Sequence, residues 1–330
     1  MAKFLQQEKL IQIEWKSKTS HLSLDAKKEG IFKNGITYPF FLPSQTSYEN
    51  LFYEIREKAI FYFKNHGIEW HDNNGEAPSS HLCDSQVCCV NFLLPLTFSK
   101  EITLSLFKRY FPTINKVLNM DDDSFVSFEW IGKENYLKER LIPGTERTRG
   151  ANCTSVDASI MFETETGKRI IVLIEWKYTE SYTTKSYKIA RSGRDRTTIY
   201  KHLWDKETCP IDKSKVVSFD SLFFEPFYQF TRQQFLAQEM EMARELGADE
   251  VFLMHISPKA NEDFKTITSK ELNGLSDSAT GTWKECLKET SKFIPVYIED
   301  FFDSNIITKD KKMQNYWEYI SERYGSIVKK

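Results

Sequence analysis

The chain has 330 residues, of which 40% are apolar and 28% charged, so it can build a large packed core and is not a disordered chain. Its formal net charge of -2 excludes a global basic field for nucleic acid or anionic membranes, so any polyanion site must be local. The first ten residues lack the apolar core of a signal peptide, and the longest fully apolar run is 170–174. These features predict a cytoplasmic protein without a membrane segment.

The cysteines lie at positions 83, 88, 89, 153, 209 and 286 and form no CxxC pair. This pattern predicts reduced thiols. His66, His71, His81 and Cys83 are close in sequence, but their spacing fits no structural zinc site, and we expect ordinary surface or core roles for them.

In chain order, the pattern predicts an N-terminal extension, a helix over 48–63, a buried helix ending near Pro95 and an amphipathic helix around 104–110. Three strands follow, over 125–131, 155–163 and 168–177, and the last two are joined by a short Thr-Gly loop. A helix over 228–247 with Gly247 as its stop, a strand over 250–256 and a mainly helical end complete the chain. This order predicts an α/β fold with a mixed central sheet and flanking helices.

The tetrapeptide IEWK occurs twice, at 13–16 and 174–177. The second copy closes the hairpin of the second and third strands. A register centred on Thr166 places Val156, Ala158, Ile160 and Phe162 opposite four apolar residues, Trp176, Ile174, Val172 and Ile170. The same register puts Asp157 opposite Glu175. The first copy has only a short stretch before it, with no upstream Asp on a partner strand, and is interpreted as an ordinary element edge.

Opposed carboxylates repel each other, so a positive charge is expected between Asp157 and Glu175. Lys177 supplies one such charge, and a divalent cation would supply another. Mg²⁺ prefers oxygen ligands and retains waters, one of which can attack a phosphodiester. We therefore expect Asp157, Glu175 and the main-chain carbonyl of Trp176 to hold Mg²⁺, with Mn²⁺ as a substitute, and Lys177 to orient or deprotonate the attacking water. The alternative is a half-exposed patch of structural ion pairs.

An Asp followed, after 17 residues, by Glu-x-Lys at the end of the next strand resembles the PD-(D/E)xK nuclease superfamily. The stretches SQVCCVNFLLPL, RGANCTSVDASIMF and IEWKYTESY resemble a bacterial group of uncharacterised restriction endonucleases within it. The resemblance runs from Ser79 to Pro258, and Val156 stands where the motif name has proline. It implies a restriction-endonuclease-like core of helix, three antiparallel strands, helix and strand over 79–260. Residues 1–78 then form an N-terminal extension with helices, and 261–330 a mainly helical extension packed on the core.

The superfamily often adds an acid or amide from elements near the hairpin. Gln86, Glu129 and Gln233 are the candidates here, with Asn91 and Arg232 as further polar residues; the alternatives are buried hydrogen bonding for Gln86 and Asn91 and solvent for the others.

The segment 185–202 carries a local formal charge of +5 and is the candidate DNA-binding stretch, through Lys185, Lys188, Arg191, Arg194, Arg196 and Lys201. Tyr187 and Tyr200 could contact bases or sugars, and Arg147 and Arg149 could extend the patch. The alternative is a solvated loop.

The sequence thus predicts a magnesium-dependent endonuclease for double-stranded DNA, of the type II restriction kind. Alternatives are a nuclease of this fold in DNA repair, mobile-element function or RNA processing, and a DNA-binding protein that does not cut. By analogy with restriction enzymes, we expect a homodimer and a cognate DNA methyltransferase that acts on the same site.

Overall fold

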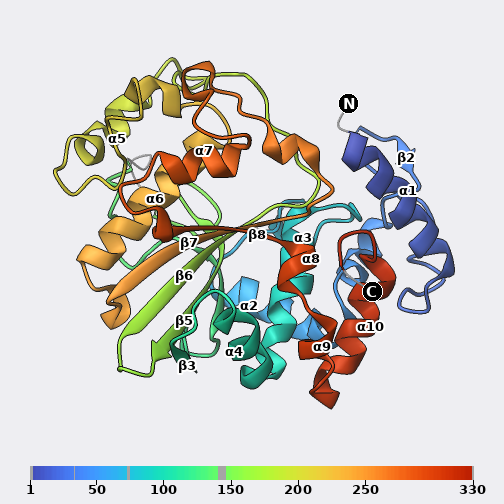
Figure 1. The fold of residues 1–330 in the computed structure, drawn as a ribbon. Helices are drawn as coiled ribbons and strands as arrows, with labels where there is room; N and C mark the ends of the chain where they lie inside the picture. Colours follow the sequence, from blue (N-terminus) through green and yellow to red (C-terminus); the bar gives the residue numbers. More distant parts are fainter. Residues whose placement is uncertain (1–2, 33, 73–74, 140–145, 329–330) are drawn as a thin grey trace.

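A six-stranded mixed sheet forms the centre of the computed structural model, which describes residues 3–32, 34–72, 75–139 and 146–328 (Figure 1). The strand order is β3–β5–β6–β7–β8, and β4 also pairs with β5. The pairs up to β6 are antiparallel, whereas β7 runs parallel to β6 and β8 parallel to β7. The bounds are β3 Ile114–Leu118, β4 Val126–Trp130, β5 Val156–Thr164, β6 Arg169–Trp176, β7 Glu250–Ser257 and β8 Phe293–Tyr297. The predicted α/β class with a mixed sheet and flanking helices is confirmed.

Helices cover both faces of this sheet (Figure 1). One apolar core joins the strands to α1 (Lys3–Lys18), α2 (Arg56–Asn65), α3 (Ser85–Leu93), α4 (Lys100–Lys108), α8 (Ile298–Phe301), α9 (Ser304–Ile307) and α10 (Gln314–Arg323). A second core, on the other face, includes α5 (Thr197–Trp204), α6 (Phe227–Met242) and α7 (Ala279–Glu285). Within β6, Val172 and Ile174 belong to the first core and Ile171 and Leu173 to the second. Strands buried on both faces explain why the sequence of β6 is a nearly continuous apolar run.

The hairpin of β5 and β6 keeps the predicted register over six residue pairs, from Ala158–Ile174 to Glu163–Arg169. The predicted pairing of Val156 with Trp176 is wrong: Val156 pairs with Trp130 and packs in the second core, while Trp176 packs in the first. The reason lies at Asp157, whose carboxylate accepts the Trp176 amide hydrogen at 2.6 Å. The Asp157 side chain thus binds an amide that a longer ladder would use, and the β5–β6 pairing stops at Ala158, the residue after Asp157.

The first helix, α1, and the last, α10, lie side by side at one side of the sheet (Figure 1). Helix α1 contacts α10, and the Arg323 side chain from α10 bonds to Gln12 in α1 and to Asn50. The first IEWK copy lies in the second half of α1. There Lys16 is buried and its Nζ donates to the carbonyl oxygens of Lys28, Pro39 and Phe41, so this copy fastens the N-terminal segment.

Several boundaries differ from the prediction because tertiary contacts use the backbone differently. Residues 44–50 and 53–55 form short 3-10 turns, and the helix predicted over 48–63 begins only at Arg56. Here the amide of Phe52 donates to the Asn91 side chain and the carbonyl of Asn50 accepts from Arg323. Helix α6 ends at Met242, before Gly247, since Arg244 and Leu246 both adopt left-handed conformations.

Strands β3 and β8 were not predicted, and a small separate pair, β1 (Gly30–Ile31) with β2 (Thr37–Tyr38), precedes the core. Strand β8 comes from the segment expected to be mainly helical. In the described part of the chain, no single helix is long and apolar enough to cross a membrane.

Candidate active site

Asp157 and Glu175 lie at adjoining ends of β5 and β6, where the paired ladder stops. Glu175 is completely buried, and Asp157 is partly exposed. Burial and, next in importance, the negative charge of Glu175 raise the pKa of Asp157 well above its ordinary value. The structure therefore brings the two predicted acids into electrostatic contact, although they are not a registered ladder pair.

Lys177 joins this pair from the residues that follow β6. Its Nζ lies 2.6 Å from Glu175 Oε1, and both side chains are nearly or fully buried. Burial acts against the ammonium, but the charge of Glu175 and further acidic groups outweigh it, so the pKa of Lys177 is raised. Lys177 is therefore an ammonium at neutral pH.

Helix α6 contributes Gln233, which is buried against the ends of these strands. Its Nε2 donates to Glu175 Oε2 and, at 3.2 Å, to the carbonyl oxygen of Ser155. The two oxygens of Glu175 thus have different partners, Lys177 on one and Gln233 on the other. Such a doubly held carboxylate has a fixed orientation.

Glu129 adds a third carboxylate from β4. Its backbone has φ of 50°, a left-handed conformation that is uncommon for a residue with a side chain. Its neighbours Phe128 and Trp130 pair with Ala158 and Val156 of β5, whereas Glu129 has no registered partner in that ladder. Ser155 Oγ donates to Glu129 Oε2 at 2.7 Å. Burial raises the pKa of Glu129, to which the charge of Glu175 adds a smaller contribution.

Gln86 and His71 lie beside Glu129. Gln86, in α3, accepts the His71 amide hydrogen at 3.0 Å and donates to the carbonyl oxygen of Glu69 at 3.3 Å. The His71 ring is about half exposed, with Nδ1 3.5 Å from Asp84 Oδ2. Burial acts against its charged form, but Asp84 and more distant acids raise the pKa of His71. Asn91 lies elsewhere: it bonds to Phe52 and Tyr324 within the first core.

The donor set suits a divalent cation in its chemistry, although across the residues described no three His, Cys, Asp or Glu side chains converge closely enough to form a metal cluster by themselves. The charges of Glu129 and Glu175 both act on Asp157, and Lys177 is the cation paired with Glu175. Burial first, and then the charges of Glu175 and Glu129, raise the pKa of Asp157, so a cation beside it would stabilise its ionised form. Because Mg²⁺ takes one or two carboxylates and completes its shell with water, Asp157 and Glu175 fit such an ion without a third acidic ligand.

The predicted DNA-binding cations divide into two groups. Lys188 and Lys201 are paired with Asp220 and Asp205, at 2.6 and 2.7 Å, and Arg196 donates to the Tyr187 carbonyl oxygen at 2.7 Å. The others are exposed and form no ion pair with a described residue; they are Lys185, Arg191 and Arg194. Three of the six predicted cations therefore form no ion pair or side-chain hydrogen bond with the residues that the structure describes.

The two tyrosines of this segment are engaged within the protein. Tyr200 is buried and donates to Glu139 Oε1 at 2.7 Å. Tyr187 stacks on Tyr228, with ring centroids 5.8 Å apart and an interplanar angle of 10°. Arg232 lies over the Tyr228 ring at 4.7 Å and donates to Thr154 at 3.3 Å, so it is not a solvated residue.

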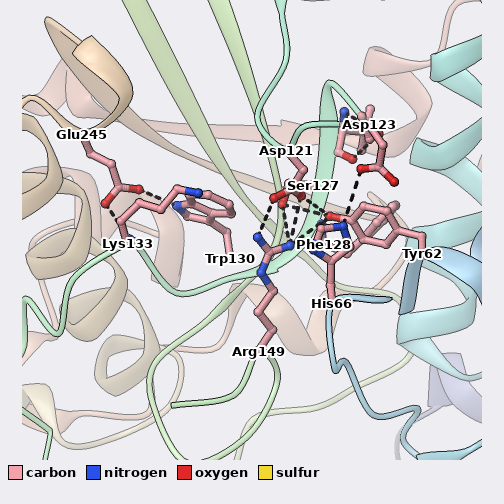
Figure 2. A network of polar contacts seen from close by, with 12 residues as sticks. Tyr62, His66, Asp121, Asp123, Ser127, Phe128, Trp130, Lys133, Arg149 and Glu245 are labelled. Atoms are coloured by element: carbon pink, nitrogen blue, oxygen red, sulfur yellow. Dashed lines mark hydrogen bonds and ion pairs between the residues drawn. The ribbon is translucent and has the colours of Figure 1, made fainter. Parts of the chain in front are cut away.

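Arg149 belongs to a buried polar network, which Figure 2 shows. Its guanidinium donates to both oxygens of Asp121, at 2.6 and 3.0 Å, and also to Tyr62 and Ser127. These bonds, with the Tyr62 hydroxyl on the same carboxylate, hold the pKa of Asp121 at about 2 despite its burial. Arg147 likewise bonds to the carbonyl oxygens of residues 131–133. Both arginines fasten the segment before β5 to the sheet and do not extend the exposed basic patch.

Two residues near the site were not singled out from the sequence. His255 is the residue of β7 that pairs with Glu175, and it is buried. Burial and the positive charge of Lys177 lower the pKa of His255 to about 3. Tyr182 follows β6, and burial raises the pKa of its hydroxyl. In the sequence, the signal was a histidine inside the otherwise apolar run of a central strand.

Residues 5–325 match the family described as Restriction Endonuclease associating with ARP. Comparison with curated proteins and with solved structures gave no match. The matched region includes both end segments and the whole sheet, and it is therefore much longer than the stretch 79–258 on which the resemblance was first based. The chain belongs to the family of restriction endonucleases associating with ARP.

Proposed function

We propose that this protein is a metal-dependent DNA endonuclease of the type II restriction kind, with a restriction-endonuclease-like core. The observation that carries the proposal is the group of Asp157, Glu175 and Lys177 at the end of one hairpin, with more carboxylates than cations. A purely structural ion-pair patch would balance its buried charges. Family membership supports the nuclease class and DNA as the substrate.

Asp157, Glu175 and the main-chain carbonyl of Trp176 would hold Mg²⁺, for which Mn²⁺ would substitute. The bound ion would supply a water of lowered pKa and charge stabilisation at the phosphate. The negative charge of Glu129, which acts on Asp157, would add to the attraction for the ion, and Gln233 keeps the Glu175 carboxylate oriented.

Lys177 has the role of orienting the attacking water and stabilising charge that develops on the phosphate oxygens. The raised pKa of Lys177 favours its ammonium form, which suits orientation of the water by hydrogen-bond donation. Of the two roles expected from the sequence, orientation is therefore the better supported.

The DNA backbone would be held by the exposed cations Lys185, Arg191 and Arg194, since Lys and Arg contacts to phosphate provide most of the non-specific affinity. The ion-paired cations would contribute less, because they must first exchange a protein carboxylate for phosphate. We further propose a homodimer, a cognate methyltransferase on the same site and, from the family description, association with ARP.

Incubation of plasmid DNA with the purified full-length chain and Mg²⁺ or Mn²⁺ tests the proposal. We expect cleavage by the wild type and a loss of at least about 10³-fold in Asp157→Ala and Lys177→Ala. DNA binding without cleavage, on modified as well as unmodified DNA and with either metal, would instead support a non-cutting DNA-binding protein. Cleavage of RNA alone would assign the site to RNA processing.

A further inference from the structure

The far side of Lys177 carries buried polar atoms without partners. Among the described residues, both ring nitrogens of His255 and the hydroxyl of Tyr182 are buried and form no hydrogen bond. Most buried polar atoms in proteins are paired, because an unpaired group costs about 1–3 kcal/mol. Two such side chains next to one ammonium therefore call for an explanation.

The sheet places His255 on the same face as the catalytic group. His255 pairs with Glu175 in the parallel ladder of β6 and β7, and paired residues of neighbouring strands point to the same side. The amide of Lys177 donates to the carbonyl oxygen of Ile256 at 2.8 Å, which fixes the end of β6 against β7. The ladder and this bond hold β7 against the end of β6, and the charge of Lys177 acts on the His255 ring.

Tyr182 approaches Lys177 from the segment after β6. Both Tyr182 and His255 lie within electrostatic reach of the Lys177 ammonium. They also share an aromatic neighbour, Phe264, with ring centroids at 5.3 Å from Tyr182 and 6.4 Å from His255. The two polar side chains and Lys177 therefore converge on one buried region.

We propose that His255 and Tyr182 are positioning residues for Lys177, supplying hydrogen-bond acceptors to the N–H groups of its ammonium that Glu175 does not use. An ammonium has three N–H groups, and one side of it is taken up by the ion pair with Glu175 Oε1. A nitrogen of His255 and the oxygen of Tyr182 share a second N–H through one water, which accepts from the ammonium and donates to both, since neither side chain bonds to Lys177 directly in the structure. The remaining N–H then points toward the substrate in a single orientation. The inference rests on the proposed function.

The surroundings of His255 suggest a variant that separates this role from a structural one. Phe230, Phe264 and Phe293 contact the His255 ring, so phenylalanine fits the same space. His255→Phe keeps the aromatic packing and removes the ring nitrogens, so it should leave the melting temperature close to that of the wild type. It should lower kcat by about 10- to 100-fold with KM for DNA unchanged, because a misplaced catalytic group costs rate. Tyr182→Phe should act in the same direction.

Tyr316→Phe is the matched control, since the buried Tyr316 hydroxyl donates to the Phe92 carbonyl oxygen at 2.9 Å, away from the site. It should lower the melting temperature and leave kcat unchanged. In the Lys177→Met background, His255→Phe should have no further effect on the residual rate. Independent effects of the two changes, or a His255→Phe enzyme with wild-type kcat, would overturn the proposal.

A readout without catalysis uses the full-length chain with ¹⁵N-labelled histidine. The ring nitrogen resonances of His255, assigned through His255→Phe, should shift when Lys177 is replaced by methionine and remain in place in Tyr316→Phe. Unchanged His255 resonances in Lys177→Met would contradict the positioning role. If the wild type cleaves no nucleic acid, the endonuclease assignment fails while this measurement still decides the contact.

Discussion

Asp157 both ends the strand pairing and carries one of the two neighbouring acidic groups. Its carboxylate accepts the Trp176 amide and lies beside Glu175, so the strand pairing ends where the surplus of negative charge begins. The folded chain holds this arrangement at a cost, since burial and a like charge both disfavour the ionised form. A divalent cation would offset that cost, which makes stability a test of metal binding.

Mg²⁺ should therefore raise the melting temperature of the wild type relative to the same protein in EDTA. At 100 times the dissociation constant, one bound ion stabilises by about 2.7 kcal/mol. Asp157→Asn should abolish this shift and be at least as stable as the wild type in EDTA, because it removes one of the crowded charges. Differential scanning fluorimetry measures both effects; an equal Mg²⁺ shift in the variant would show that the ion binds elsewhere.

Asp121 gives a prediction for acid pH. Its pKa is about 2 in the folded protein and about 3.9 in an unfolded chain, so the folded state binds fewer protons between these values. This group contributes stability above about pH 4 and loses it as the pH falls toward 2, by about 2 kcal/mol in total. Urea unfolding between pH 2 and 5 should show this loss in the wild type.

Asp121→Asn serves as the comparison in that experiment. It should be less stable than the wild type at pH 7, because Arg149 loses a charged partner, and its stability should change less across the acid range. An identical pH dependence in both proteins would assign the acid sensitivity to other carboxylates.

At the scale of elements, the sequence predicted the hairpin better than its surroundings. Alternation and the apolar run determined the register from Ala158 to Glu163, because a slip by one residue would bury charges. The prediction missed the end of the ladder because a side chain, Asp157, replaces a backbone partner there. It missed β8 because a five-residue strand with a proline inside gives little periodic signal.

The additional site residues show the same limit. Gln233 and Glu129 could be named as polar residues in suitable elements, but their direction depended on long-range packing. Glu129 points to the site through a left-handed backbone that sequence patterns do not reveal. The sequence shows the positive charge of segment 185–202. It does not show that Asp205 and Asp220 pair with two of the cations, because those ion pairs form only in the folded chain.

That division of charge predicts unequal effects on DNA affinity. Replacing Lys185, Arg191 and Arg194 together by alanine should weaken binding and reduce the slope of log K against log salt by up to about 2.7, if all three contact phosphate. The matched double variant, Lys188→Ala with Lys201→Ala, should change the slope by less per residue, because these cations are already paired. Fluorescence anisotropy at several salt concentrations measures both; equal slopes in all three proteins would exclude the segment from the interface.

At the scale of the whole molecule, Arg323 ties the two ends of the chain to each other and to the core. It is fully buried and donates to Gln12, Asn50, Leu82 and Tyr319. Arg323→Met should lower the free energy of unfolding by at least about 3 kcal/mol, since it leaves several buried acceptors unpaired. Lys18→Ala, at an exposed ion pair of α1, should change it by less than about 1 kcal/mol. Chemical denaturation compares the two, and similar effects would mean that the ends are loosely attached.

Strand β8 has a further consequence for any shortened form of the protein. It covers the outer edge of β7, with five registered pairs from Leu253–Phe293 to Ser257–Tyr297. A chain cut after residue 260 would retain Asp157, Glu175 and Lys177 but present β7 as an open edge with unsatisfied amides and carbonyls. Open edges of apolar strands recruit other strands. We therefore expect such a fragment to aggregate. The solubility of the part of the chain that carries the catalytic group thus depends on β8, whose residues take no part in the chemistry.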